Sequence, residues 1–204
     1  MCFTTQQTRS ALQLEHRYQI PFYKPETFQP GLFRGFAFPQ TPVICNAQPH
    51  TIECFQWGLI PSWAKDSNIQ KYTLNARFET LSEKPSFKNV LHQRCLVLVD
   101  AFYEWKWLDP KGKKKQAYRI QFKNQDVFSL GGLWNSWTNP QTGCSVNTYT
   151  LITQEAQGIM RDLHSQTLRM PLILDKNQEA LWLNGASVNN AHSFLEGFAV
   201  DALT

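Results

Sequence analysis

Apolar and polar side chains alternate with a period of two over much of this chain, and this pattern predicts strands. From residue 52 onward Phe55, Trp57 and Leu59 occupy alternate positions, and Gly58 and Pro61 end the run. Runs rich in β-branched and aromatic residues predict further strands at 97–107 (as one or two strands), 117–122, 127–134, 146–153 and 170–174.

Helical spacing is confined to short segments. Residues 5–18 contain no Gly or Pro, and Ala11, Leu14 and Tyr18 recur at helical spacing, so a first helix is expected there. Three prolines make 20–35 an irregular connection. Further helices are expected at 79–84, 155–162 and 176–184. Because the strands outnumber the helices and do not alternate with them regularly, we expect an α+β fold with a curled, mostly antiparallel core.

Composition sets the class of protein. The chain has 204 residues without a linker-like segment, so we expect one domain over 1–204. A net charge of +4 makes the surface mildly basic, which permits an anionic partner such as nucleic acid. No run approaches the roughly 18 apolar residues of a membrane span, and the N-terminus lacks an apolar signal core. We therefore expect a soluble intracellular protein that does not associate with membranes.

Cofactor and metal chemistry is not indicated. The five cysteines form an odd set without C-x-x-C spacing, which disfavours both a disulfide framework and a zinc site. Phosphate-binding loops, the G-x-S-x-G elbow and the H-E-x-x-H motif are absent from the sequence. We expect neither a metal nor a cofactor, so any chemistry must come from organic side chains.

The pair Met1-Cys2 is the first candidate for such chemistry. Initiator methionine is normally removed when the next side chain is small, so we expect the mature protein to begin with Cys2. An α-amine titrates at about 7.7–8.0 and a free cysteine at about 8.5, so both nucleophiles are present near neutral pH. Such an aminothiol condenses with an aldehyde, first to an imine and then to a thiazolidine ring. By itself Cys2 is more often incidental.

Asn75 and Arg77 are the second candidate, since residues two apart share a face in an extended segment. An amide beside a rigid cationic fork suits a phosphate. The alternative is a helix start with Asn75 as its cap.

Glu104 lies in the aromatic run Ala101-Phe102-Tyr103-Glu104-Trp105. A desolvated carboxylate there would exchange protons near neutrality, whereas an exposed one would only pair weakly with Lys106, and the pattern leaves both alternatives open.

Three further residues carry weaker signals. His164 suits proton transfer because imidazole titrates near neutrality, although a single histidine is more often structural. Arg169 precedes an apolar strand and either binds a phosphate or is an exposed surface residue without a binding role. Trp57 fits core packing and base stacking equally well, while Trp63, beyond Pro61, is the one expected to be an exposed platform on which a nucleobase can stack.

The joint order of these segments is more specific than any one of them. Seven ordered motifs resemble the SRAP family, the SOS-response-associated peptidases: Cys2, W-G-L-I-P-S-W at 57–63, N-A-R-F-E-T at 75–80, R-C-L at 94–96, F-Y-E-W at 102–105, G-L-W at 132–134 and H…R-M-P at 164–171. The resemblance implies a barrel-like β core flanked by helices. It also implies a DNA groove ending at the terminal cysteine, which crosslinks to ring-opened abasic sites in single-stranded DNA through a thiazolidine.

The resemblance also assigns roles to residues of this chain. Cys2 would be the nucleophile, Asn75 the amide that holds the adduct, and Glu104 with His164 the acid/base pair. Those assigned to DNA binding are Arg77 and Arg169 on phosphates, Pro39 as a wedge against the bases, and Trp63 in the matching aromatic segment. It further implies a likeness to cytoplasmic, nucleoid-associated repair proteins, and we expect a monomer.

This chain departs from the family pattern in three places. Phe3 and Thr4 follow Cys2 where many members have Gly-Arg, so any contact made by that arginine is missing. Ala101 replaces a glycine, and four residues separate His164 from Arg169. Two other functions remain open on sequence grounds: an N-terminal-cysteine peptidase or amidohydrolase, and a non-catalytic module that binds single-stranded DNA. Strand nicking by a lyase reaction and self-catalysed removal of Met1 are expected side activities.

Overall fold

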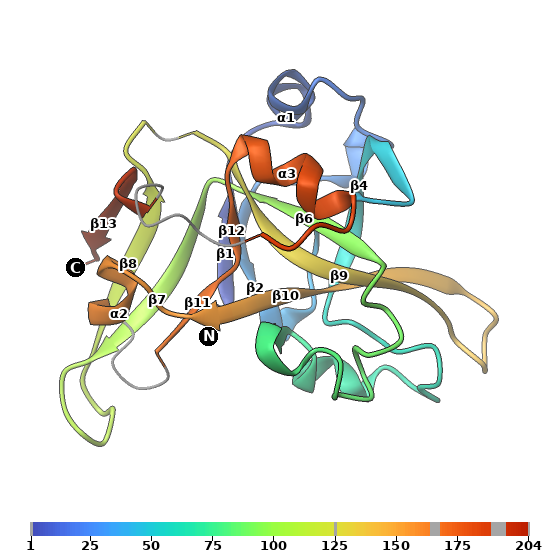
Figure 1. Ribbon diagram of the computed structural model, residues 1–204. Helices are drawn as coiled ribbons and strands as arrows, with labels where there is room; N and C mark the ends of the chain where they lie inside the picture. The colour runs from blue at the N-terminus through green and yellow to red at the C-terminus, as the bar shows by residue number, and fades with distance from the viewer. Residues whose placement is uncertain (1, 125, 164–167, 189–194, 204) are drawn as a thin grey trace.

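A closed five-stranded barrel forms the centre of the protein in a computed structural model, which describes residues 2–124, 126–163, 168–188 and 195–203 (Figure 1). The ring runs in the order β4-β3-β6-β9-β10 and closes through pairing of β10 with β4. Its strands are β3 (Gln40–Cys45), β4 (Gln48–Trp57), β6 (Arg94–Val99), β9 (Phe128–Thr138) and β10 (Ser145–Glu155). All of its pairings are antiparallel except β4–β10, so the expected α+β fold with a mostly antiparallel, barrel-like core is confirmed.

A second sheet of five strands has the order β13-β8-β7-β1-β2. These strands are β1 (Thr4–Gln7), β2 (Gly31–Arg34), β7 (Ala101–Trp107), β8 (Lys115–Phe122) and β13 (Phe198–Ala202). Only Asp100 separates β6 from β7, so the chain passes directly from the barrel into this sheet. Three short strands extend the barrel: β5 (Asn75–Arg77), β11 (Arg169–Pro171) and β12 (Ile173–Leu174).

Within the described residues, short α-helices flank the sheets at α1 (Ala11–Tyr18), α2 (Ile159–Leu163) and α3 (Lys176–Leu183). Figure 1 shows α1 and α3 on the same side of the molecule, with α3 over the barrel. Trp182 of α3 is buried and its indole N–H donates to the Cys95 carbonyl of β6 at 3.0 Å. Single 3-10 turns lie at η1 (Pro25–Thr27), η2 (Gly35–Ala37), η3 (Asn68–Tyr72) and η4 (Phe78–Thr80).

The prediction of a helix over 5–18 is wrong in its first part. Thr4–Gln7 form strand β1, because they pair with β2 on one side and with β7 on the other. The helix starts only after Ser10, whose side chain accepts from Gln13 N while the Gln13 side chain accepts from Ser10 N. This capping box is a helix-start signal that the spacing argument overlooked.

Three other predicted segments also differ. Residues 20–35 are not wholly irregular, since β2 is stabilised there by pairing with β1. The expected helix at 79–84 is replaced by the 3-10 turn η4 and the turns after it, which are closed by local backbone bonds such as Lys84 N–H to the Thr80 carbonyl. The expected helix at 155–162 is replaced at its start by the end of β10, where pairing of Glu155 with Arg169 satisfies the backbone hydrogen bonds that a local helix would otherwise make.

The core fills the barrel and the space between the two sheets. Trp57 is fully buried and its indole N–H donates to the Leu74 carbonyl at 2.9 Å, which decides for core packing between its two alternatives. Trp63 is 53% exposed, as the sequence predicts. Within the described part of the chain, no helix is long and apolar enough to cross a membrane.

Candidate functional site

Cys2 lies inside the molecule, directly before strand β1. Its side chain is 0% exposed and belongs to the main core cluster with Trp57, Leu74 and Tyr149. Burial raises the pKa of the Cys2 thiol, and the nearby Glu104 carboxylate adds to this rise. The thiol is therefore neutral at physiological pH and is kept from water in the structure as it stands.

Strand β1 is fixed in place by the buried carboxylate of Asp100. Gln6 Nε2 donates to Asp100 Oδ1 at 2.8 Å, and the Thr8 backbone N–H donates to Asp100 Oδ2 at 2.8 Å. The hydroxyl of Tyr103 donates to Gln6 Oε1 at 2.6 Å. Because these bonds hold the strand that follows Cys2, Asp100 positions the start of the chain. Sequence reasoning missed this residue, although it stands directly before the aromatic run that contains Glu104.

Asn75 contacts Cys2 directly, because the side-chain Nδ2 of Asn75 donates to the Cys2 carbonyl at 2.9 Å. It is the first residue of β5, which pairs in parallel with β10 through Leu151. Asn75 and Arg77 are two apart on this strand, with Asn75 half-buried and Arg77 exposed. The alternative of a helix start at Asn75 is wrong, since the residue is in a strand.

A pocket of about 370 Å³ opens beside Asn75 and Arg77. Tyr72, Lys84 and Phe87 also line it, so it combines aromatic surface with positive charge. The pocket is connected to Cys2 through Asn75, which lines the pocket and also donates to the Cys2 carbonyl.

Glu104 is 2% exposed, which decides between the two alternatives that the sequence left open. It lies on β7, and its charge is close enough to raise the pKa of the Cys2 thiol. The structure thus brings together a thiol, an amide and a carboxylate, from three segments far apart in sequence. We refer to Cys2, Asn75 and Glu104 as the candidate site.

Arg169 is held differently from the other predicted contacts. Its Nη1 and Nη2 donate to the two carboxylate oxygens of Glu79 at 2.7 and 2.9 Å, and Nη2 also donates to the Thr153 carbonyl at 2.5 Å. The side chain is buried, so it braces β11 against η4 and β10. A contact of Arg169 with phosphate remains a prediction, and it would require this brace to open.

The remaining predicted residues surround the candidate site or fall outside the description. Pro39 is partly exposed, and its carbonyl accepts from the backbone N–H of Trp57 at 2.9 Å. The Trp63 indole N–H donates to the Pro85 carbonyl at 3.3 Å, which fixes the exposed ring next to the segment that lines the pocket. His164 lies outside the described residues, so its predicted acid/base role stays a prediction.

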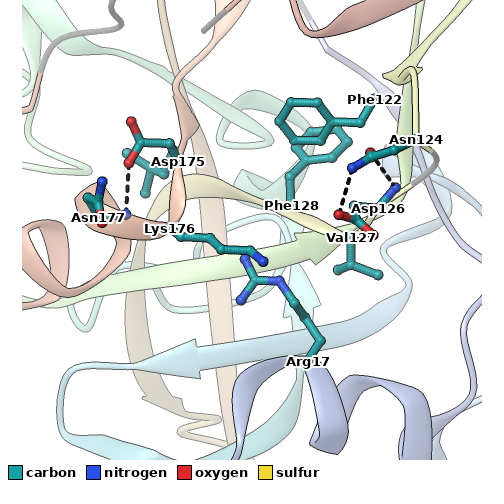
Figure 2. A pocket seen from close by; sticks show the side chains of 10 residues that line it. Arg17, Phe122, Asn124, Asp126, Val127, Phe128, Asp175, Lys176 and Asn177 are labelled. Carbon is teal, nitrogen blue, oxygen red and sulfur yellow. Dashed lines mark hydrogen bonds between the residues drawn. The ribbon is translucent and has the colours of Figure 1, made fainter.

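Another pocket, of about 330 Å³, lies between α1, α3 and the connection from β8 to β9. Figure 2 shows the ends of Arg17 and Lys176 close together in it, with Phe122 and Phe128 behind them. Among the described residues that line this pocket there is no predicted site residue and no cysteine, serine or histidine.

Comparison with known proteins finds a matching family model, similar named proteins and similar solved structures. The family model described as SOS response associated peptidase (SRAP) matches residues 1–204. The chain is 47% identical over 143 residues to the abasic site processing protein YoqW of Bacillus subtilis, covering 70% of this chain and 61% of YoqW. It is 31% identical over 196 residues to the abasic site processing protein HMCES of Xenopus tropicalis, covering 84% of this chain and 56% of HMCES. The chain thus spans about three fifths of the length of these relatives.

Solved structures show the same fold. A crystal structure of a protein from Bacteroides thetaiotaomicron superposes with a TM-score of 0.87 at 28% identity, covering 100% of this chain and 92% of the other. A second, from Bordetella bronchiseptica, superposes with a TM-score of 0.81 at 20% identity and covers 100% of both chains. The barrel and its accompanying sheet are therefore an architecture shared with these proteins.

Proposed function

This chain belongs to the SRAP family, and from that premise we propose that it processes abasic sites in DNA by crosslinking covalently to them through Cys2. The substrate is the ring-opened deoxyribose aldehyde in single-stranded DNA, and the product is a thiazolidine that shields the lesion. The observation that carries the proposal is the hydrogen bond from Asn75 to the Cys2 carbonyl at 2.9 Å, together with the buried Glu104 beside the same thiol.

The amine reacts before the sulfur. Burial raises the pKa of the Cys2 thiol, so little thiolate is available to attack first. Once Met1 has been removed, the free α-amine adds to the aldehyde carbon and loses water, which gives an imine. The thiol then adds to the same carbon: a carbon–sulfur bond forms and the thiol proton passes to nitrogen. Aldehyde and aminothiol are thereby converted to thiazolidine and one water.

Glu104 and Asn75 have distinct roles in this sequence. Glu104 accepts and returns the protons that the condensation moves, as its position near the thiol allows. Asn75 fixes the peptide of Cys2, so that amine and thiol face the aldehyde together. Holding the reacting groups in this geometry supplies most of the acceleration. His164 takes the predicted role of assisting the loss of water.

The DNA lies along the basic and aromatic surface around the candidate site. Arg77 contacts a phosphate, while Pro39 and Trp63 hold the neighbouring bases apart. Each phosphate that is neutralised on a single strand lowers the slope of log affinity against log salt by about 0.7. The imine intermediate also permits elimination of the 3′ phosphate, so some strand nicking accompanies the crosslink.

Oligonucleotides that differ only at the lesion test this proposal. Protein whose intact mass shows the loss of Met1 is incubated with single strands that carry an abasic site, a tetrahydrofuran analogue without the aldehyde, or an intact base. We expect an SDS-resistant band with the abasic strand alone. Absence of that band with correctly trimmed protein would refute the crosslinking function.

Hydrolysis of a peptide or amide is the second candidate, because the family description itself names a peptidase. Cys2 together with His164 and Asn75 has the residue types of a cysteine hydrolase. Turnover of peptide or amide substrates without a lesion-dependent band would support this activity. Binding of single strands without either reaction would indicate a non-catalytic module.

A further inference from the structure

An exposed aromatic ring, Phe36, rests on the residue next to Cys2. Phe3 follows Cys2 directly, and its ring contacts Phe36 of η2 with 5.1 Å between centroids and 32° between planes. Phe36 is 60% exposed, whereas Phe3 is half-buried and packs against the main core cluster. A single exposed aromatic residue needs no explanation, but an exposed ring supported by a second ring one residue from Cys2 calls for one.

The backbone holds this pair firmly. The Gly35 backbone N–H donates to the Phe3 carbonyl at 2.9 Å, and the 3-10 turn of η2 is closed by Phe38 N–H on the Gly35 carbonyl at 2.9 Å. A Cβ on Gly35 would stand 3.3 Å from the Leu74 side chain and 3.4 Å from the Phe3 carbonyl oxygen. The turn therefore packs tightly on the start of β1, and the ring of Phe36 is carried outward at a fixed position.

The position of the pair indicates what it binds. Phe3 is the next residue after Cys2, and consecutive Cα atoms are about 3.8 Å apart, so the pair is attached to the chain immediately beside Cys2. Arg34 is exposed and lies opposite Thr4 in the pairing of β1 with β2, which places a cation beside the pair. A flat apolar face next to a positive charge matches a nucleobase with its phosphate.

We propose that Phe36, supported by Phe3, is a stacking platform for the nucleobase adjacent to the abasic sugar. This inference rests on the proposed function and adds a subsite to it. An abasic nucleotide has no base of its own to stack, so the strand can be held there only by its phosphates and by its neighbours' bases. The platform gives the site a preference for a lesion flanked by an intact base over a run of baseless sugars.

Fluorescence anisotropy with tetrahydrofuran strands tests the platform without the covalent step. The lesion is flanked by adenine on both sides, on the 5′ side alone, on the 3′ side alone, or on neither side. We expect wild-type protein to bind at least one adenine-flanked strand more tightly than the strand with no flanking base. In Phe36→Ala this preference should fall by about fivefold or more, since one stacked base contributes roughly 1–3 kcal/mol.

Matched variants separate stacking from general apolar contact. Phe36→Trp keeps a π-face and should retain the preference, whereas Phe36→Leu keeps the apolar volume and should lose most of it. Tyr23→Ala removes another exposed aromatic ring, one that lies before η1 and contacts Lys24, and should leave every affinity unchanged. Because Phe36 is exposed, these substitutions should not prevent folding, and thermal melting checks this directly.

The outcomes distinguish this inference from the proposed function. If Phe36→Ala weakens binding equally with and without flanking adenine, or not at all, the platform is refuted even where crosslinking of the wild type succeeds. Conversely, failure of the wild type to crosslink with true abasic strands refutes the chemistry, while the binding preference is measured independently of it. A surface that docks a protein instead would show no dependence on the flanking base and would likewise overturn the inference.

Discussion

Two arginine–glutamate pairs, one near the candidate site and one joining α1 to α3, have almost the same length and opposite electrostatic outcomes. Arg169 and Glu79 are 2.7 Å apart and the Glu79 side chain is 48% exposed, whereas Arg17 and Glu179 are 2.9 Å apart and the Glu179 side chain is 11% exposed. Hydrogen bonding to Arg169 lowers the pKa of Glu79. Burial raises the pKa of Glu179 in spite of Arg17.

The difference shows how each region is stabilised. Glu179 is part of a buried network in which Ser129 Oγ donates to its Oε1 at 2.7 Å and the Tyr18 hydroxyl lies 3.0 Å from Ser129 Oγ. Such a network fixes the two helices on the sheets. Glu79 is half exposed but Arg169 is buried, so separating this pair would leave a buried guanidinium without its carboxylate partner. The two pairs thus differ in the exposure of the glutamate: the α1–α3 pair is largely buried on both sides, whereas the pair between η4 and β11 is open to water on its glutamate side.

Cys2→Ala should give the largest functional effect and should act on the candidate site alone. The variant retains an α-amine, so it can form the imine, but it has no sulfur to close the ring. The adduct surviving heat should fall by roughly a hundredfold or more, equivalent to about 2.7 kcal/mol, and strand nicking should rise. Gel quantification of both products measures this. Equal durability of the two adducts would contradict ring formation.

Trp182→Ala should lower the stability of the fold and leave the crosslinking chemistry unchanged. It removes a buried ring and its bond to Cys95, and it should lower the free energy of unfolding by about 3–5 kcal/mol. Crosslinking per folded molecule should stay the same, because Trp182 packs from α3 onto β6 and not against Cys2. Urea unfolding measures the loss, with the exposed neighbour Leu181→Ala as control, which should change stability by less than about 0.5 kcal/mol. If the crosslinking rate per folded molecule fell as well, the α1–α3 region and the candidate site would not be independent.

Asn75→Ala should slow crosslinking by about tenfold, in line with the roughly 0.5–1.5 kcal/mol that a single hydrogen bond contributes. It removes the donor to the Cys2 carbonyl, so the aminothiol would be less well oriented. Single-turnover rates measure the effect, and anisotropy on the tetrahydrofuran strand should show nearly unchanged binding. Loss of binding without loss of rate would place Asn75 in DNA recognition instead.

The smallest expected effect is on the pH dependence of stability, to which Glu79 and Glu179 contribute in opposite directions. Because the pKa of Glu79 is lowered on folding, its stabilising contribution is present above the unfolded value of about 4.3 and is lost as the pH falls through the lowered pKa. Because the pKa of Glu179 is raised, its contribution is present below that value and is lost as the pH rises through the raised pKa.

Glu79→Gln should therefore flatten the loss of stability in acid by about 0.5 kcal/mol, a value reduced by solvent screening. Glu179→Gln should flatten the loss on the way to neutral pH. Urea midpoints from pH 3 to 8 measure both. If the pH dependence of stability changed in the same direction in both variants, the different burial of Glu79 and Glu179 would not explain their opposite pKa shifts.

Much of the barrel could be predicted because its strands carry their own alternation. Phe55 and Trp57 are buried at alternate positions of β4 as the pattern requires. Strand β1 could not be predicted, since Thr4–Gln7 are all polar and all buried, and only their pairing with β2 and β7 makes them a strand. Its polar side chains are satisfied by partners such as Asp100, which lies 94 residues from Gln6.

The candidate site shows the same division. Residue types and motif order identified Cys2, Asn75 and Glu104, but the contact between Asn75 and Cys2 spans 73 residues and is invisible in the sequence. The burial of Glu104 was undecided because an aromatic run fits either face of a strand. The pair formed by Arg169 with Glu79 was likewise hidden, since a surface arginine and a braced one have the same local sequence.

Burial of Cys2 has a practical consequence for the stability of the protein in storage and during labelling. A neutral thiol inside the fold reacts slowly with oxidants and alkylating reagents, whereas Cys144 is exposed and should be modified first. Limited treatment with a maleimide dye should therefore attach a fluorophore on the loop between β9 and β10 and leave the reactive end of the chain intact.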